Sequence, residues 1–299
     1  MTALSTHEIN IGILSYSAIQ AETVVILNDT PREQQGRAMR VLVIGANGRL
    51  GRACVVALSS RSHTVIAMVR DANAFPIEFK SHCEAVVEAD ARTLEPIAEA
   101  LRTHRCDGVI QAGGYTPFWV WQTSDLPLIF TATLDAAESV ARERSGGGDI
   151  VPDKRIRAWM MCDVGMMDSP WNDTFLWHYL PPMFPIHRTT FPLLTQRPTE
   201  SVAWSAMCPA MMLPGEKRSD VGDVEFGGPK FPNWRNTMLW VPLLGKYLNA
   251  FFVGWLYMTT TYESVAGFMA DDFQVGPESG LVGRKVGPNR VPGGKAFLF

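Results

Sequence analysis

The stretch VLVIGANGRLGRACVVAL, Val41–Leu58, decides the fold of this chain. It begins with a continuous apolar run, which is typical of a strand buried on both faces of a sheet. Glycines then recur at every third position, at Gly45, Gly48 and Gly51, and apolar residues with helical spacing follow. The order strand, glycine-rich turn and helix predicts the first unit of an α/β protein.

Strand and helix patterns alternate along the chain after residue 40. We expect strands within 40–45, 63–70, 83–90, 107–114, 155–165 and 201–212, and helices within 49–60, 93–104 and 124–144. Fully buried strands that alternate with helices imply a doubly wound parallel sheet, because right-handed crossovers place helices on both of its faces. The predicted fold class is therefore α/β, with a doubly wound parallel Rossmann sheet.

The composition argues against several classes of protein. Of the 299 residues, 46% are hydrophobic and 19% are charged, which is enough to bury a large core. The net charge is −3 and there is no basic stripe, so nucleic-acid binding is not expected. Five scattered cysteines without a Cys-x-x-Cys pair indicate reduced intracellular thiols rather than disulfides or a metal site. No segment has the pattern of a signal peptide, so we expect a cytoplasmic protein.

Two segments need separate interpretation. Residues 1–38 precede the first strong strand signal and form an extension of uncertain structure, whereas 39–299 are expected to form a single domain. The segment Leu239–Met258 approaches the length of a membrane span, but proline, lysine and asparagine interrupt it. This interruption favours a buried helix over membrane insertion. The oligomeric state stays open.

The glycine spacing fits a dinucleotide-binding turn. In such a turn the first glycine allows a tight bend, the second lets the backbone approach a pyrophosphate, and the third lets helix and strand pack closely. The helix N-terminus offers free N–H groups and a partial positive charge to the phosphates. The loop residues expected to contact a cofactor are Gly45, Asn47, Gly48, Arg49, Leu50 and Gly51.

The end of the second predicted strand bears on the choice of cofactor. An acidic residue there would bind the adenosine 2′-hydroxyl and favour NAD(H). Arg70 occupies this place, and its guanidinium can pair with a 2′-phosphate, with Arg49 as a second phosphate contact. Asp71 follows directly and leaves the opposite interpretation open. The sequence thus favours NADP(H) over NAD(H).

Several segments together resemble the NmrA-like, atypical short-chain dehydrogenase/reductase family. They are the glycine loop, the strand-end Arg70, EADART at 88–93, VIQAGG at 109–114 and TTTYESVAGFMADDF at 259–273. The resemblance covers about residues 39–288. The family that the chain resembles includes tailoring enzymes of fungal secondary metabolism.

The resemblance implies roles for further residues. Asp90 and Ala91 would lie near the adenine, and Gln111, Ala112 and Gly113 along the nicotinamide half of the cofactor, with Cys162 also in contact with it. It also implies a small C-terminal substrate lobe, formed mainly by 166–200 and 212–258.

The chain departs from the superfamily at the catalytic pair. Its reductases typically carry a serine after the fifth strand and a Tyr-x-x-x-Lys pair on the next helix, where tyrosine transfers the proton and lysine lowers the tyrosine pKa. No Tyr-x-x-x-Lys occurs in this sequence. Cys162 and Asp163 stand at the serine position, Tyr179 is followed four residues later by Met183, and the lysine position falls near His187 or Arg188.

Three replacements for the proton relay are open. Asp163 would face the nicotinamide crevice, where burial would raise its pKa and make it a usable acid or base; its alternative role is an Asx-turn or helix cap. Tyr179 or the neighbouring histidine could donate the proton, with His187 or Arg188 supplying positive charge. Cys162 as a nucleophile is the weakest candidate, because no paired base is recognisable.

Aromatic and methionine side chains follow three of the predicted strands. Because these strand ends converge on one opening, the side chains predict a pocket for a bulky, flat or polycyclic apolar substrate. The alternative is ordinary core packing beneath a lid. The predicted pocket residues are Tyr115, Phe118, Trp119, Trp121, Trp171, Trp177, Met211 and Met212.

These observations favour an NADP(H)-dependent oxidoreductase acting on a bulky hydrophobic small molecule. It would be a tailoring enzyme of secondary metabolism that reduces a carbonyl, an imine or iminium, or a conjugated C=C bond. Reduction of an imine asks less of a Tyr–Lys pair, because no alkoxide must be protonated. Two alternatives stay open: a redox-neutral isomerase, dehydratase or cyclase on the same scaffold, and a regulator that senses NADP without turnover.

Overall fold

A computed structural model describes residues 37–290, apart from 118, 120, 182–183 and 216–223. The predicted extension therefore lies almost wholly outside the described residues. The strands are β1 Arg40–Ile44, β2 Thr64–Val69, β3 Ala85–Glu88, β4 Gly108–Gln111, β5 Arg157–Met161, β6 Ala203–Met207, β7 Met212–Leu213, β8 Val224–Gly227, β9 Thr260–Thr261 and β10 Lys285–Arg290. The α-helices are α1 Arg49–Ser60, α2 Ile77–Lys80, α3 Leu94–Thr103, α4 Leu126–Arg144, α5 His187–Thr195, α6 Gly245–Tyr257 and α7 Tyr262–Phe273.

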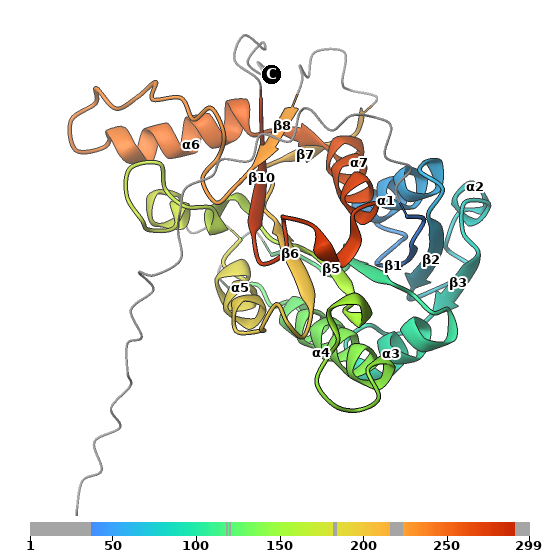
Figure 1. The fold of residues 1–299 in the computed structure, drawn as a ribbon. Coiled ribbons are helices and arrows are strands. Elements are labelled where there is room, and N and C mark those ends of the chain that lie inside the picture. The colour runs from blue at the N-terminus through green and yellow to red at the C-terminus, as the bar shows by residue number, and fades with distance from the viewer. Residues whose placement is uncertain (1–36, 118, 120, 182–183, 216–223, 291–299) are drawn as a thin grey trace, which may run out of the picture.

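One large sheet forms the centre of the molecule (Figure 1). Its eight strands follow the order β3-β2-β1-β4-β5-β6-β10-β8, and every neighbouring pair is parallel except β10 with β8. A short parallel pair, β7 with β9, lies apart from it. The predicted α/β fold class with a doubly wound parallel sheet is confirmed.

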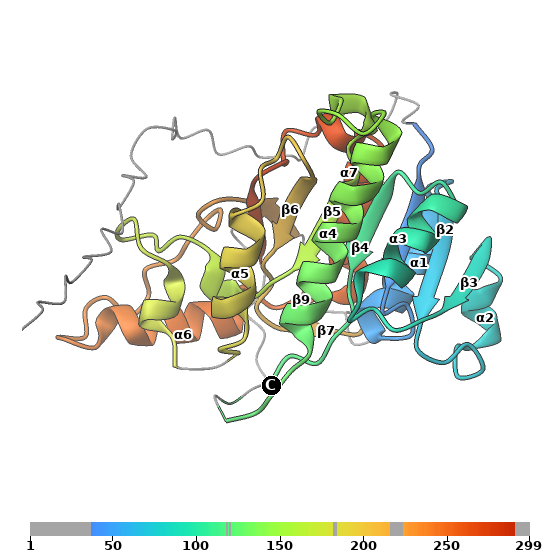
Figure 2. The same ribbon diagram turned by 90° about the horizontal axis from the view of Figure 1, so that it is seen from below.

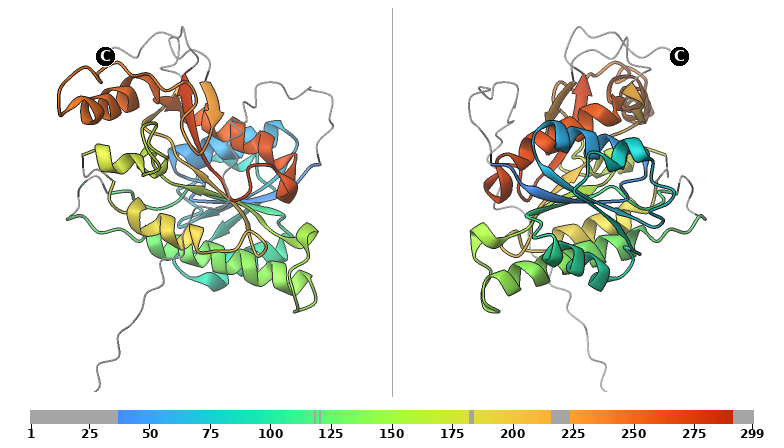
Figure 3. Two further views of the ribbon diagram at one scale, coloured as in Figure 1. Left: turned by 60° about the vertical axis from the view of Figure 1, so that its left-hand side comes forward. Right: turned by 90° about the vertical axis from the view of Figure 1, so that its right-hand side faces the viewer.

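Helices cover both faces of the sheet. α1 packs against α7 on one face, and α3, α4 and α5 lie on the other (Figures 2 and 3). Alternate residues of β1 enter the two cores: Val41 and Val43 join the core beneath α1 and α7, and Leu42 and Ile44 join the core beneath α3 and α4. A strand buried on both faces needs a continuous apolar run, which explains the strength of this signal in the sequence.

The sheet order positions the site. The chain steps outward from β1 through β2 to β3 and then returns to β4 on the other side of β1. In open α/β sheets the crevice at such a switch point, beyond the carboxyl ends of the strands, is where ligands bind. The glycine turn after β1 and the segments after β4, β5 and β6 all meet at this edge.

Two features of the C-terminal half differ from expectation. The sheet extends beyond β6 to β10 and β8, and neither strand was predicted. The segment Leu239–Met258 was expected to be a buried helix, but α6 begins only at Gly245 and leaves Tyr247 51% and Phe252 38% exposed, while Val253 on its other side is buried. No helix within the described residues is long and apolar enough to cross a membrane.

A buried ion pair docks the C-terminal helix onto the sheet. Arg157 of β5 and Asp272 of α7 approach to 2.7 Å and are almost fully buried. Trp159 also donates its indole N–H to Asp272 over 2.9 Å. A buried charge pair is tolerated when its remaining hydrogen-bonding groups are satisfied, as they are here. The pair ties α7, which covers α1, to the centre of the sheet.

Candidate cofactor and active site

The glycine turn after β1 makes closer backbone contacts than any other residue type allows. Gly45 has φ of +76°, and its N–H donates to the carbonyl of Met68 over 3.0 Å. A Cβ at Gly45 would lie 2.3 Å from the α-carbon of Gly113, and one at Gly51 would lie 2.2 Å from the carbonyl oxygen of Gly45. The first and third glycines of the motif are therefore fixed by a positive φ and by close packing.

The start of α1 offers hydrogen-bond donors to an anion. Within the described part of the chain, the amides of Arg49, Leu50 and Gly51 have no backbone carbonyl as partner. No acidic residue stands in the first turn of the helix. The helix dipole adds positive potential at this end. The turn and helix start therefore fit the pyrophosphate of a dinucleotide.

The two charged residues after β2 differ in their hydrogen bonding. Asp71 accepts hydrogen bonds from the amides of Asn73 over 2.8 Å and Ala74 over 3.2 Å, so its Oδ1 is committed to the local turn. Arg70 is exposed at the strand end, and its charge adds to the larger effect of the Arg92 hydrogen bond in lowering the pKa of Asp90. One carboxylate oxygen of Asp71 is thus engaged in the turn, whereas within the described residues the Arg70 guanidinium forms no hydrogen bond.

Asp90 has a neighbour that the sequence did not single out. Arg92 binds the Asp90 carboxylate at 2.6 Å, and this hydrogen bond, with the backbone N–H of Arg92, lowers the Asp90 pKa to about 2. The carboxylate is therefore ionised at neutral pH and held by its neighbour two residues on. Ala91 packs against the sheet core between them.

Arg52 is a second residue that the sequence analysis missed. Its guanidinium donates to Oδ1 of Asn47 over 2.7 Å and stacks on the ring of Phe79 at 5.3 Å from the centroid. Asn47 in turn donates to the carbonyl of Ala74 over 3.3 Å. Nε of Arg52 is buried and has no partner among the described residues. Arg52 thus positions the glycine loop against the adenosine side.

Gln111 at the end of β4 holds an unsatisfied acceptor. Its side chain is fully buried, and Nε2 donates to the carbonyl of Gly113. Its Oε1 is buried without a partner in the described part of the structure. A buried polar atom that lacks a partner is costly and calls for a ligand or water. The adjacent Ala112 donates its N–H to Ile44 over 3.0 Å, which closes β4 onto β1.

Asp163 lies two residues beyond the end of β5. Its carboxylate accepts the backbone N–H of Gly165 and so caps the 3-10 helix Val164–Met166. The Asx-type cap considered from the sequence is therefore present. Burial of the carboxyl group nevertheless raises its pKa to about 7, despite the opposing effects of this hydrogen bond and of the Arg188 charge. Asp163 can therefore both cap the turn and exchange a proton near neutral pH.

Cys162 is unsuited to act as a nucleophile. The thiol is buried beside Cys208 at the ends of β5 and β6. Its pKa is raised mainly by the hydrogen bond with Cys208 and also by burial. The thiolate form required for nucleophilic attack is thus disfavoured. All five cysteines of the chain are free thiols. Within the described residues, no cluster of three or more histidine, cysteine or acidic side chains could hold a metal ion.

The two candidates for positive charge differ in their environment. His187 is only 3% exposed, and burial lowers its pKa to about 4, so the imidazole is neutral at pH 7. The expectation that His187 supplies positive charge is therefore corrected. Arg188 is partly buried, and its guanidinium carbon lies 5.8 Å from the ring centroid of Trp177. Its charge also acts on Asp163.

Tyr179 belongs to an aromatic group beside α6. Its hydroxyl accepts a hydrogen bond from Asn172 over 2.9 Å, and its ring meets Trp171 edge-on at 5.1 Å. Tyr247 of α6 approaches the same ring at 5.7 Å. The structure thus ties Tyr179 to the packing between the segment after β5 and α6.

The predicted pocket residues fall into two groups and an outlying pair. Trp171 and Trp177 lie in the segment after β5, where Trp177 packs on Phe175 at 4.3 Å. Trp119 and Trp121 stack on each other at 5.2 Å in the loop after β4 and stay 43% and 72% exposed, as does Tyr115 at 58%. Phe118 lies outside the described residues. Met212 begins β7 and pairs with Thr260 of β9, and the carbonyl of Met211 accepts the N–H of Thr260 over 2.9 Å.

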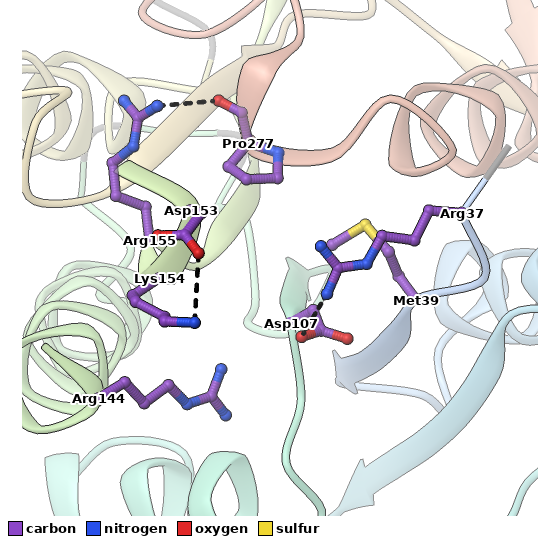
Figure 4. Close-up of a pocket in the computed structure, with 8 residues that line it drawn as sticks. All are labelled: Arg37, Met39, Asp107, Arg144, Asp153, Lys154, Arg155 and Pro277. Carbon is purple, nitrogen blue, oxygen red and sulfur yellow. Dashed lines mark hydrogen bonds and ion pairs between the residues drawn. The ribbon is translucent and has the colours of Figure 1, made fainter. Parts of the chain in front are cut away.

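A cavity of about 310 Å³ lies elsewhere (Figure 4). Its lining includes Met39, Asp107 and Arg155, which precede β1, β4 and β5, so it lies at the amino edge of the sheet. None of the predicted site residues line it. Chemistry at the sheet switch point requires the opposite edge, and we place the site there.

Comparisons with known proteins agree with this geometry. Residues 45–144 match an NAD(P)H-binding family model. Over 72 residues the chain is 42% identical to a 3-diazoavenalumate denitrifying reductase from Streptomyces; the match covers 24% of this chain and 22% of that relative. The family match indicates NAD(P)H binding by the segment that carries the glycine turn.

Solved structures share the fold at low sequence identity. A candidate epimerase from Bacteroides thetaiotaomicron aligns with a TM-score of 0.57 at 17% identity, over 85% of this chain and 98% of that one. A candidate NADH-flavin reductase from Streptococcus pneumoniae aligns with a TM-score of 0.54 at 17% identity, over 85% and 100%. The anaerobillin reductase ChuY from Escherichia coli aligns at 0.52 and 13%, over 83% and 96%. The Rossmann-type fold is common to all three.

Proposed function

We propose that this protein is an NADP(H)-dependent reductase of a bulky, hydrophobic small molecule, and that Asp163 supplies the proton. The observation that carries the proposal is the position of this partly buried carboxyl group. It lies beyond β5, at the same sheet edge as the glycine turn and Gln111. An acid whose pKa is close to 7 can give up a proton at neutral pH and be reprotonated from solvent.

These residues define which steps of the proposed reduction the cofactor and the protein would each carry out. A bound nicotinamide supplies the hydride. The glycine turn and the start of α1 hold the pyrophosphate, and Gln111 offers its unpaired acceptor along the nicotinamide half. Asp163 holds the proton at its carboxyl oxygen and delivers it to the basic atom of the reduced bond. The aromatic side chains after β5 exclude water from that atom.

The reducible bond is an imine or iminium, a conjugated C=C bond or a carbonyl. A single carboxylic acid without a tyrosine–lysine pair suits an imine or iminium best, because hydride addition to C=N forms neither an alkoxide nor an enolate. The Streptomyces relative is named as a denitrifying reductase of a diazo compound, which supports a reductive reaction for this chain. Arg49 and Arg70 support NADP(H) over NAD(H) through pairing with the 2′-phosphate. A cytoplasmic, NmrA-like tailoring enzyme of secondary metabolism fits these properties.

Calorimetric titration with NADPH and NADH, followed by a turnover assay on a panel of aryl imines, enones and ketones, tests the proposal. We expect tighter binding of NADPH and loss of nicotinamide absorbance with at least one substrate class. Product formation without a net absorbance change would instead identify a redox-neutral enzyme. Tight NADP binding without turnover across the panel would identify a regulator. Failure to bind either nucleotide would overturn the proposal.

A further inference from the structure

One cation at the candidate site has no role in the reduction described above. Arg188 lies in the first turn of α5 and is partly buried. Within the described residues its guanidinium forms no salt bridge with a carboxylate, whereas Arg102, Arg157 and Arg197 each do. A partly desolvated guanidinium without an anion is unfavourable, so its placement calls for an anionic partner.

The charges near Arg188 offset its positive charge only when Asp163 is ionised. The first turn of α5 contains no acidic residue, and this end of a helix is itself positive. The neighbouring His187 is buried and neutral. The Asp163 carboxyl is engaged by the N–H of Gly165, and in its acidic form it carries no charge. When Asp163 is protonated for catalysis, the site therefore has a net positive charge at Arg188.

Aromatic side chains connect Arg188 with the turn that carries Asp163. The guanidinium stacks over the ring of Trp177, which packs on Phe175. Trp177 also lies directly against Gly165: a Cβ at that glycine would lie 3.2 Å from the Trp177 Cβ and 2.8 Å from Oδ1 of Asp163. Arg188, Trp177 and the Asp163–Gly165 turn are thus neighbours in the structure.

From this arrangement we propose that the substrate carries a carboxylate that binds Arg188, attached to a flat conjugated or aromatic body. The inference rests on the proposed reductase function and narrows its substrate class to conjugated organic acids. The guanidinium lies over the Trp177 ring, and its parallel N–H groups match the two oxygens of a carboxylate. The body of the acid then lies along Trp177, with its unsaturated bond directed toward Asp163.

Calorimetric titration of the NADP⁺-loaded full-length protein tests the proposal, with trans-cinnamate and 2-naphthoate as probes and their methyl esters as uncharged counterparts. We expect each acid to bind the wild type at least about tenfold more tightly than its ester, since a hydrogen bond to a charged group contributes roughly 1.5–3 kcal/mol and 1.4 kcal/mol is a factor of ten. Arg188→Gln should remove this preference, and Arg188→Lys should restore part of it.

Arg142→Gln serves as the matched control, because this exposed arginine lies on α4 and pairs with Glu138. It should leave the preference for the acids unchanged. The proposal is overturned if the acids bind no better than their esters, if neither binds, or if the preference survives in Arg188→Gln. NADP⁺ affinity of the same samples separates the two proposals. Normal NADP⁺ binding without acid preference refutes only the carboxylate site, whereas loss of nucleotide binding in the wild type refutes the reductase function.

Discussion

Gly45 at the end of β1 and Gly113 after β4 are in direct backbone contact. A Cβ on Gly45 would overlap the α-carbon of Gly113 at 2.3 Å, and the residue also has φ of +76°. This contact closes the crevice floor between the two strands that flank the switch point. It brings the glycine turn beside the segment that carries Gln111. The close contact of these two glycines therefore holds the two halves of a dinucleotide site together.

Gly45→Ala should therefore abolish nucleotide binding and lower the stability of the fold. The added methyl group cannot be accommodated by a side-chain movement, because the atoms it meets belong to the backbone. Calorimetric titration with NADPH and thermal unfolding measure the two effects. Gly148→Ala is the control, since a Cβ there meets nothing within 4 Å. Equal NADPH affinity in the Gly45 variant and the wild type would refute this account of the turn.

Arg70→Gln should weaken binding of NADPH by about 10- to 100-fold and leave NADH binding nearly unchanged, which follows from loss of a charge-assisted hydrogen bond to the 2′-phosphate. The ratio of the two dissociation constants is the quantity to measure. Arg284→Gln is a matched control, because this exposed arginine precedes β10 at the opposite edge of the sheet. An unchanged NADPH-to-NADH ratio in the Arg70 variant would assign the 2′-phosphate to other residues.

Much of the sheet could be predicted from the sequence because its central strands are buried on both faces. Each therefore appears as a continuous apolar run with turn residues beside it. β10 has the sequence KVGPNR, in which only Val286 is a typical strand residue. It is a strand because Lys285 and Val286 pair with Ala206 and Met207 of β6, a contact between distant segments that no local pattern reveals. α5 was missed because Pro192 interrupts its helical pattern.

The residues of the candidate site likewise include some that a local sequence pattern predicts and others that depend on contacts between distant segments. The glycine turn is a local motif and could be predicted, whereas Arg52 acts through Phe79, which is distant in sequence. The neutral state of His187 follows from burial beneath several elements and has no counterpart in the sequence. The pairing of Arg188 with Trp177 likewise arises only when α5 folds back onto the segment after β5.

Asp163→Asn should lower the turnover rate by about 10²- to 10⁴-fold, the usual contribution of a positioned general acid. The reduction requires the protonated acid, so the wild-type rate should fall as pH rises through about 7, the pKa that burial produces. In the variant the rate should no longer fall as pH rises through about 7, while the affinity for NADPH should stay unchanged. Asparagine still accepts the Gly165 N–H, which preserves the cap. A variant rate that equals the wild type would exclude Asp163 as the proton donor.

His187→Phe should make the protein more resistant to acid. Burial lowers the pKa of His187 to about 4 in the folded state, against an ordinary value of 6.5, so below pH 6.5 the unfolded chain binds a proton that the folded chain does not. Stability linked to this residue is therefore complete above pH 6.5 and is lost progressively as pH falls toward 4. Denaturant unfolding at pH 7.5 and pH 5 should show a smaller loss of free energy of unfolding in the variant than in the wild type. His82→Gln, a change at an exposed histidine, should lose as much as the wild type. If the wild type and His187→Phe lose equal stability over this interval, the imidazole is not held neutral by burial.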